Sequence, residues 1–269
     1  MEIIIQKRRY YVEVSGEGAP LLLLHGFTGS SETWKETITH LKRDYTCIAV
    51  DIIGHGKSSC PLEKEAYSIE LAAEDMKALM KELGHPRFHV MGYSMGGRLA
   101  LTLAVLFPKS VQSLLLESAS PGLKTPEERQ ARERSDEALA ERIEREGIES
   151  FVDYWQRLPL FATQNNLPQW KQQAIYQQRL RNSVIGLSRS LRGMGTGSQP
   201  SWWEVLPMLP MPVLLVTGTE DVKFTKIASE MAQLLPSAIW KEIKGAGHAI
   251  HVEDSEKFGT IIKEFLSHT

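Results

Sequence analysis

Residues 88–107, FHVMGYSMGGRLALTLAVLF, decide the fold of this chain. They begin with an apolar run, Phe88–Met91, that is typical of a buried strand, and they end in a helical apolar pattern from Arg98 to Phe107. Between the two lies the pattern G-x-S-x-G, with Ser94 at its centre. A side chain on either glycine would collide with backbone in so tight a turn, while the serine hydroxyl is lifted clear of the sheet. We therefore predict a nucleophilic serine on a strand–turn–helix; the alternative is a glycine-rich turn without catalytic chemistry.

A serine hydroxyl needs a base, and an imidazole base needs a carboxylate that orients it. An acid and a histidine are therefore expected downstream of Ser94. The apolar run Val213–Thr217 is followed by Asp221, and a glycine-rich loop after Trp240–Ile243 carries His248. We predict that these three residues, in the chain order serine, aspartate, histidine, form a catalytic triad.

Both predicted partners of the serine have a neighbour of the same chemical type. Glu220 precedes Asp221, and we interpret it as a turn residue that faces solvent. His251 follows His248 by three positions, and we interpret it as a structural or solvated histidine on the next helix. His25 stands in a turn nearer the N-terminus, where a buried structural role is expected.

A second turn at the end of a strand supplies candidates for stabilising negative charge. The apolar run Leu21–Leu24 is followed by the sequence HGF at residues 25–27. The backbone N–H of Phe27 and that of Met95, which follows Ser94, are predicted to form an oxyanion hole with two donors.

Short apolar runs recur along the chain with helical patterns between most of them, which predicts a mostly parallel sheet with helices on both faces. Glu2–Val14 is rich in Ile, Tyr and Val and predicts a hairpin. The pattern is interrupted where Glu127–Glu146 mixes Arg, Glu and Asp with Ala and Leu. We predict an α/β core made of residues 1–120 and 201–269, with a helical cap inserted at residues 121–200.

The composition excludes several classes of protein. The 269 residues include 31 Lys and Arg against 33 Asp and Glu, and a net charge of −2 gives no broad attraction for nucleic acid or an anionic membrane. Cys47 and Cys60 are too few for a disulfide framework and are not spaced as zinc ligands. No apolar stretch is long enough for a signal peptide or a transmembrane helix. We expect a cytoplasmic protein that binds a small molecule; no motif specifies an oligomeric state.

The motifs together resemble those of the α/β-hydrolase fold superfamily over nearly the whole chain; they are residues 25–27, 51–58 and 92–97, Asp221 and His248. The resemblance implies that residues 121–200 cover the active site and set substrate choice. Ten arginines lie in this segment, and Arg98 stands about one helical turn beyond Ser94. Because guanidinium groups bind carboxylates with two parallel hydrogen bonds, these residues favour a substrate with two or three carboxylates.

In detail, the chain is similar to the 2-succinyl-6-hydroxy-2,4-cyclohexadiene-1-carboxylate synthases of menaquinone biosynthesis at residues 92–98, 118–123, 127–132 and 153–155. This resemblance implies a lyase that eliminates pyruvate from 2-succinyl-5-enolpyruvyl-6-hydroxy-3-cyclohexene-1-carboxylate, with no metal and no organic cofactor. It implies that the anionic substrate is bound by Tyr93, Arg98, Arg132, Trp155 and Arg181. Arg129 and Arg179 are the alternatives for the two arginines of the cap.

The chemistry expected of a lyase is compatible with a triad. Our hypothesis is that Ser94, deprotonated through His248, removes a ring proton alpha to a carbonyl while Asp221 holds the imidazole. The backbone donors at Phe27 and Met95 stabilise the developing enolate. Two other functions stay open: a serine hydrolase of a small ester, thioester or C–C bond, and a receptor of the same fold that binds without turnover.

Overall fold

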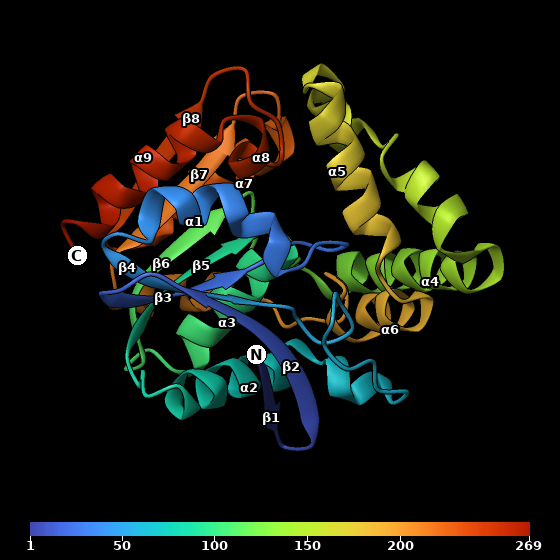
Figure 1. The fold of residues 1–269 in the computed structure, drawn as a ribbon, viewed down its shortest axis with the longest axis horizontal. Helices are drawn as coiled ribbons and strands as arrows, with labels where there is room; N and C mark the ends of the chain where they lie inside the picture. The colour runs from blue at the N-terminus through green and yellow to red at the C-terminus, as the bar shows by residue number, and fades with distance from the viewer.

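A single mixed sheet forms the centre of the protein (Figure 1). The computed structural model describes residues 1–269. Its eight strands lie in the order β1-β2-β4-β3-β5-β6-β7-β8. The pairs from β4 to β8 are parallel, whereas β2 is antiparallel to both β1 and β4. The strands are β1 (Glu2–Ile5), β2 (Arg8–Ser15), β3 (Ala19–Leu24), β4 (Tyr45–Val50), β5 (Phe88–Tyr93), β6 (Val111–Glu117), β7 (Val213–Gly218) and β8 (Ala238–Ile243).

Strand β3 shows why the central strands are apolar without alternation. Leu22 and Leu24 belong to the larger hydrophobic core on one side of the sheet, and Leu21 and Leu23 belong to the core on the other side. All four side chains are fully buried. A strand that is covered on both faces gains from an apolar side chain at every position, so its sequence reads as a continuous run.

Helices cover both faces of the sheet, as predicted. Figure 1 shows α1 and α9 on one face and α2 and α3 on the other. The helices that pack on the core are α1 (Lys35–Leu41), α2 (Ile69–Glu82), α3 (Met95–Leu106), α7 (Val222–Leu234), α8 (Ile250–Glu253) and α9 (Ser255–Leu266), with short 3-10 helices η1 (Ser31–Trp34), η2 (Lys64–Tyr67) and η4 (Trp203–Met208).

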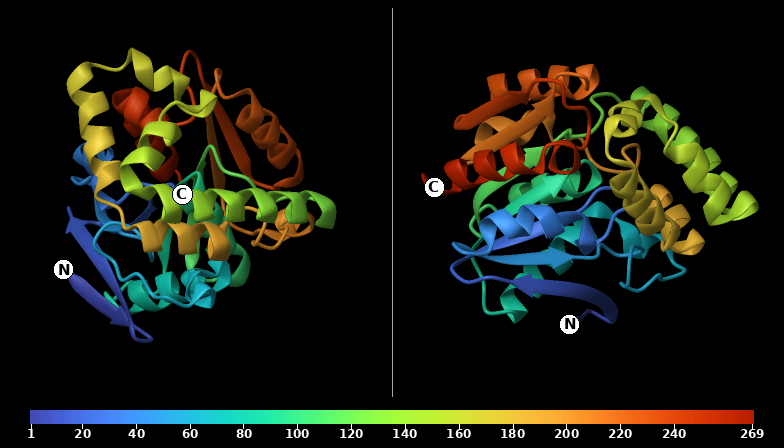
Figure 2. Two further views of the ribbon diagram at one scale, coloured as in Figure 1. Left: turned by 90° about the vertical axis from the view of Figure 1, so that its right-hand side faces the viewer. Right: turned by 45° about the horizontal axis from the view of Figure 1, so that its top comes forward.

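Between β6 and β7 the chain forms a group of helices that stands beyond one end of the sheet (Figure 2). Thr125 starts the first of them, because its side chain accepts from the backbone of Glu128 and the Glu128 carboxylate accepts from the backbone of Thr125. Gly147, with φ of 80°, then breaks this long helix into two. The group consists of α4 (Pro126–Trp155), η3 (Pro159–Asn166), α5 (Gln169–Leu180) and α6 (Val184–Met194).

These helices have a small hydrophobic core of their own, separate from the two cores of the sheet. It is made where α4 packs on α6, by Ala140, Ile143, Phe151, Val152, Leu187 and Leu191. The helices all lie within residues 121–200. None of the helices in the protein combines the length and the apolar composition that crossing a membrane requires.

Candidate active site

Ser94 stands in a sharp turn between β5 and α3. Its φ of 51° and ψ of −108° lie in a region that a residue with a side chain rarely adopts. The flanking glycines make the turn feasible: a Cβ on Gly92 would lie 2.2 Å from the carbonyl oxygen of Gly96, and a Cβ on Gly96 would lie 2.1 Å from that of Leu24. The glycines of the sequence pattern are therefore required by close backbone packing, as predicted.

The structure brings Ser94, His248 and Asp221 together in one chain of contacts. His248 Nε2 lies 3.0 Å from Ser94 Oγ, and His248 Nδ1 lies 2.6 Å from Asp221 Oδ2. Asp221 immediately precedes α7, where its other carboxylate oxygen accepts from the backbone N–H of Phe224 at 3.4 Å. The imidazole and the carboxylate are buried, whereas Ser94 is partly exposed. This geometry allows proton transfer between the hydroxyl and the imidazole.

The loop that carries His248 is tied to the inserted helices. The backbone N–H of Gly247 donates to Glu253 Oε2 at 2.6 Å, and Glu253 Oε1 accepts from the hydroxyl of Thr163 in η3 at 2.9 Å. A Cβ on Gly247 would lie 2.2 Å from Thr163 Oγ1. Glu253 was missed by the sequence analysis, since no local pattern distinguishes it from a solvated residue of α8. It links the histidine loop to the segment above it.

The two backbone N–H groups predicted for an oxyanion hole are both free. Neither Phe27 nor Met95 donates its backbone N–H to an acceptor within the protein. The turn before Phe27 is held by His25, whose Nδ1–H donates to the carbonyl of Gly26 at 2.8 Å while its Nε2 accepts from the backbone of Ile52 at 3.0 Å. His25 is fully buried, and it has the structural role expected of it.

A cavity of about 200 Å³ opens over Ser94. Most residues predicted to contact a ligand line it together with the serine and His248; they are Phe27, Tyr93, Met95, Arg98, Arg132 and Trp155. Burial raises the pKa of the Tyr93 phenol well above its usual value, so this group is a neutral hydrogen-bonding partner. The indole N–H of Trp155 is buried and has no acceptor in the protein. The cavity thus offers an imidazole, a hydroxyl and several unpaired donors to a ligand.

Arg98 is the most deeply buried cation of this cavity, with 9% of its surface exposed. Burial lowers the pKa of its guanidinium to about 10, the charge of Arg132 contributes in the same direction, and the charge of Asp136 opposes both. Its one side-chain partner is neutral, because Nη1 donates to Gln199 Oε1 at 2.5 Å. Arg132, by contrast, pairs with Asp136 one helical turn further along α4, at 2.7 Å. The two guanidinium groups therefore face one cavity, and a single carboxylate, that of Asp136, is the counter-charge for both.

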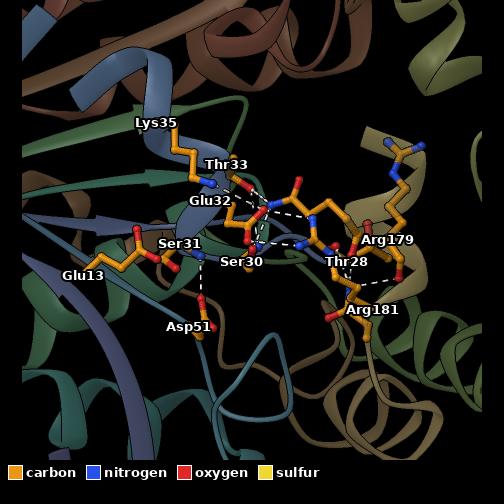
Figure 3. A network of polar contacts seen from close by, with 12 residues as sticks. Glu13, Thr28, Ser30, Ser31, Glu32, Thr33, Lys35, Asp51, Arg179 and Arg181 are labelled. Atoms are coloured by element: carbon orange, nitrogen blue, oxygen red, sulfur yellow. Dashed lines mark hydrogen bonds and ion pairs between the residues drawn. The ribbon is translucent and has the colours of Figure 1, made fainter. Parts of the chain in front are cut away.

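The structure does not bring Arg181 to the cavity over Ser94. Its side chain is 60% exposed and donates two hydrogen bonds to Glu32, of 3.2 and 2.9 Å. Figure 3 shows that the side chain of Arg179 leaves α5 in a different direction. Residues two apart on a helix point about 200° apart around its axis, so one of the two arginines is buried and the other is mostly exposed, although both line the second cavity described next.

Arg179 is the arginine that α5 buries, with 7% of its surface exposed. It lines a second cavity of about 320 Å³, which Phe27, Tyr93 and Phe161 separate from the one over Ser94. Its guanidinium lies 4.8 Å from the centre of the Phe161 ring and donates to Gln164 Oε1 at 3.2 Å. Burial lowers its pKa to about 10. Arg179, the alternative to Arg181, is thus the buried one of the two, and neither lines the cavity over Ser94, so the choice between them as a ligand-binding residue stays a prediction.

Glu220 and His251, the alternatives to Asp221 and His248, lie outside the chain of contacts that includes Ser94. Glu220 is exposed at the surface, as expected of a turn residue. His251 is buried, and its Nδ1 lies 2.8 and 2.9 Å from the carboxylate oxygens of Glu117.

No cluster of three or more His, Cys, Asp or Glu side chains is placed to hold a metal ion.

Comparison with known proteins agrees with this architecture. The family model for the alpha/beta hydrolase fold matches residues 19–255. A Bacillus subtilis (strain 168) protein, provisionally named 2-succinyl-6-hydroxy-2,4-cyclohexadiene-1-carboxylate synthase, is 42% identical over 96% of this chain and 95% of its own length. The chain belongs to the synthase family of that name, within the α/β-hydrolase fold. It is therefore an enzyme of this fold class, as predicted.

Solved structures of relatives show the same fold. MenH from S. aureus superimposes with a TM-score of 0.91 at 36% identity, covering 96% of this chain and 98% of that one. A thermophilic esterase from Thermogutta terrifontis superimposes with a TM-score of 0.87 at 25% identity, covering 100% of this chain and 98% of that one. The second comparison shows that a hydrolase and a synthase family share one scaffold.

Proposed function

We propose that this enzyme eliminates pyruvate from 2-succinyl-5-enolpyruvyl-6-hydroxy-3-cyclohexene-1-carboxylate to give 2-succinyl-6-hydroxy-2,4-cyclohexadiene-1-carboxylate. The observation that carries the proposal is the Ser94–His248–Asp221 chain beneath a cavity lined by Arg98 and Arg132. A base next to paired guanidinium groups suits a substrate that must lose a proton and that bears several carboxylates. The names of the relatives point to the same reaction.

In this proposal Ser94 is the base. Asp221 accepts the Nδ1–H of His248, which leaves Nε2 unprotonated and directed at the serine hydroxyl, 3.0 Å away. The serine proton moves to Nε2, and the alkoxide removes the ring proton alpha to the succinyl carbonyl. The electron pair of that C–H bond forms a double bond to the neighbouring ring carbon, the existing ring double bond shifts by one position, and the C–O bond to the enolpyruvyl group breaks. The departing enolate takes the proton from His248 Nε2 and becomes pyruvate, which restores the neutral imidazole and the serine hydroxyl. The charged imidazole is stabilised by Asp221.

The negative charge that develops on the carbonyl oxygen needs hydrogen-bond donors. The unpaired backbone N–H groups of Phe27 and Met95 are fixed by the two turns that end β3 and β5, so they act without reorganising during the reaction. No metal and no organic cofactor takes part in this scheme.

Substrate binding is assigned to the remaining residues of the cavity. Arg98 and Arg132 bind carboxylates, and Tyr93 and Trp155 supply a neutral O–H and N–H. For the third arginine we assign Arg179 of the adjoining cavity in preference to Arg181, because it is buried and has no carboxylate partner. We also assign residues 121–200 as the cap over the core of residues 1–120 and 201–269, and we place the enzyme in the cytoplasm.

A serine hydrolase of a small ester, thioester or C–C bond is the second candidate. It is favoured by the same triad geometry and by the likeness to the Thermogutta esterase. In that reaction Ser94 attacks a carbonyl carbon and does not remove a proton. The paired arginines of the cavity count against it, since a neutral ester has no use for them.

The test is a coupled assay of pyruvate release, with the substrate made in situ by the enzymes of the preceding steps. The parent enzyme is expected to release pyruvate well above the spontaneous rate, and Ser94→Ala and Arg98→Ala are expected to lose most of that activity. Arg145→Ala is the matched control, because its side chain is exposed and paired with Glu146. An enzyme that hydrolyses p-nitrophenyl esters rapidly and releases no pyruvate would establish the hydrolase.

A further inference from the structure

The buried arginines of this protein differ from the surface arginines in the kind of partner they have. Arg98 and Arg179 each donate to a glutamine side-chain oxygen and are paired with no carboxylate. Arg145 and Arg181, whose side chains are 67% and 60% exposed, are paired instead with the carboxylates of Glu146 and Glu32. An ion pair would be expected inside rather than outside, because a buried charge without a counter-charge is costly. The neutral partner is therefore a feature to be explained.

Gln199 is fixed by its surroundings at the point where the chain returns from the inserted helices to the core. It is fully buried. Its Nε2 lies 3.4 Å from the carbonyl of Pro200, and a Cβ on Gly122 would come within 2.7 Å of that nitrogen. The backbone beside it is closed by a hydrogen bond of 2.8 Å from Trp202 to Pro121. The amide oxygen is consequently directed at Arg98 and has little freedom to turn away.

A neutral acceptor orients a guanidinium without cancelling its charge. A carboxylate in the same place would orient it equally well, but it would satisfy the positive charge that an anionic ligand needs. Arg98 and Arg132 share the cavity, and Asp136 is paired with only one of them. A second internal carboxylate would leave the pair with no net positive charge.

We propose that Gln199 is a positioning residue that holds Arg98 in the cavity over Ser94 without bonding it to a carboxylate, and that this makes the cavity selective for a carboxylate-bearing substrate. The identity of the substrate rests on the proposed function. The selectivity for carboxylates does not, because it follows from the contacts of Arg98 and Arg132 in the cavity.

The decisive variant is Gln199→Glu, which keeps the shape of the side chain and adds the missing counter-charge. For pyruvate release we expect KM to rise about 10-fold or more with a smaller change in kcat, since one charge-assisted contact to the substrate is lost. The dissociation constant of succinate, measured by thermal shift as a simple dicarboxylate probe, is expected to rise likewise. The melting temperature without ligand is expected not to fall, because a buried cation gains a partner.

Two further variants separate charge from packing. Gln199→Met removes the acceptor without adding charge, so it is expected to raise KM less than Gln199→Glu does. Gln130→Glu adds the same charge on the exposed part of α4 and is expected to leave KM within about twofold of the parent. Labelling of Ser94 by a neutral fluorophosphonate is expected to proceed at similar rates in all of them.

The proposal is overturned if Gln199→Glu leaves both KM and succinate binding within twofold of the parent. It is also overturned if both variants lower the melting temperature and the labelling rate to a similar extent, since Gln199 would then serve packing only. A parent enzyme that binds succinate and releases no pyruvate would remove the proposed substrate and leave the succinate comparison to decide the role of Gln199.

Discussion

The protein contains two buried histidine–carboxylate pairs, and their histidines, His248 and His251, are three residues apart in sequence. His248 Nδ1 lies 2.6 Å from Asp221, and His251 Nδ1 lies 2.8 Å from Glu117. All four side chains are almost completely buried, with no more than 4% of any of them exposed. By distance and burial alone, the two pairs are equivalent.

The pairs differ in what their imidazole rings can reach. His248 has Ser94 Oγ at its second nitrogen and lines the cavity. The His251 ring lies among the aromatic rings of Trp34, Tyr93 and Phe258, with centroids 4.9, 4.6 and 6.1 Å away. Glu117 also accepts from the backbone N–H of His251 at 3.0 Å. A carboxylate beside a histidine is therefore a way to fasten a loop as well as a way to prepare a base.

The largest effect that separates the pairs is on turnover. His248→Ala removes the group that takes the serine proton, and we expect kcat for pyruvate release to fall by roughly 10³-fold or more. The free energy of unfolding is also expected to fall, because Asp221 is left buried without its partner, so activity is compared per folded molecule. His268→Ala, an exposed histidine near the C-terminus, is the matched control and should retain full activity. Turnover of His248→Ala at the parent rate would remove the triad from the mechanism.

The second pair is expected to act on stability. Glu117→Ala leaves His251 and its backbone N–H without their acceptor inside the core, and we expect a loss of roughly 3 kcal/mol in the free energy of unfolding. Urea denaturation measures this loss. Activity per folded molecule should stay within about threefold, and a drop as large as that of His248→Ala would show that Glu117 belongs to the catalytic apparatus.

A third pair, His25 and His55, tests what happens without a carboxylate. The rings lie 5.2 Å apart and are fully buried, and burial lowers the pKa of His25 to about 4 and that of His55 to about 3. The unfolded chain binds more protons than the folded one below the ordinary histidine pKa, so stability is lost as the pH falls from about 6.5 toward 4.

We expect the loss of unfolding free energy to approach about 1.4 kcal/mol per pH unit for each of the two rings, as measured by urea denaturation at several pH values. His25→Asn should reduce the slope. A parent protein whose stability is constant between pH 6.5 and 4.5 would contradict this assignment.

Much of the fold follows from local pattern in the sequence. The buried strands are predicted because they are covered on both faces, and the turn at Ser94 because only glycine tolerates its contacts. Both lie at positions where neighbours in sequence decide the structure. The order of Ser94, Asp221 and His248 then places them at one end of a parallel sheet, where strand ends meet.

Long-range contacts could not be predicted in the same way. The choice between Arg179 and Arg181 depends on how α5 is rotated about its axis, and a helix with few apolar residues carries no strong signal of its phase. Gln199 and Glu117 find partners far away in sequence, 101 and 134 residues distant. Neither residue differs locally from a surface residue, so only the folded structure reveals its role.

The chain leaves the core and returns to it at a single place. Trp202 donates its backbone N–H to Pro121, and the Trp203 indole donates to the carbonyl of Gly122 at 2.9 Å. Since the two ends of the insertion already touch, helices of another length can be spliced between them without displacing a strand. If Gln199 acts as proposed, any segment inserted at this place must supply its own neutral acceptor for Arg98, or the cavity over Ser94 loses its preference for carboxylates.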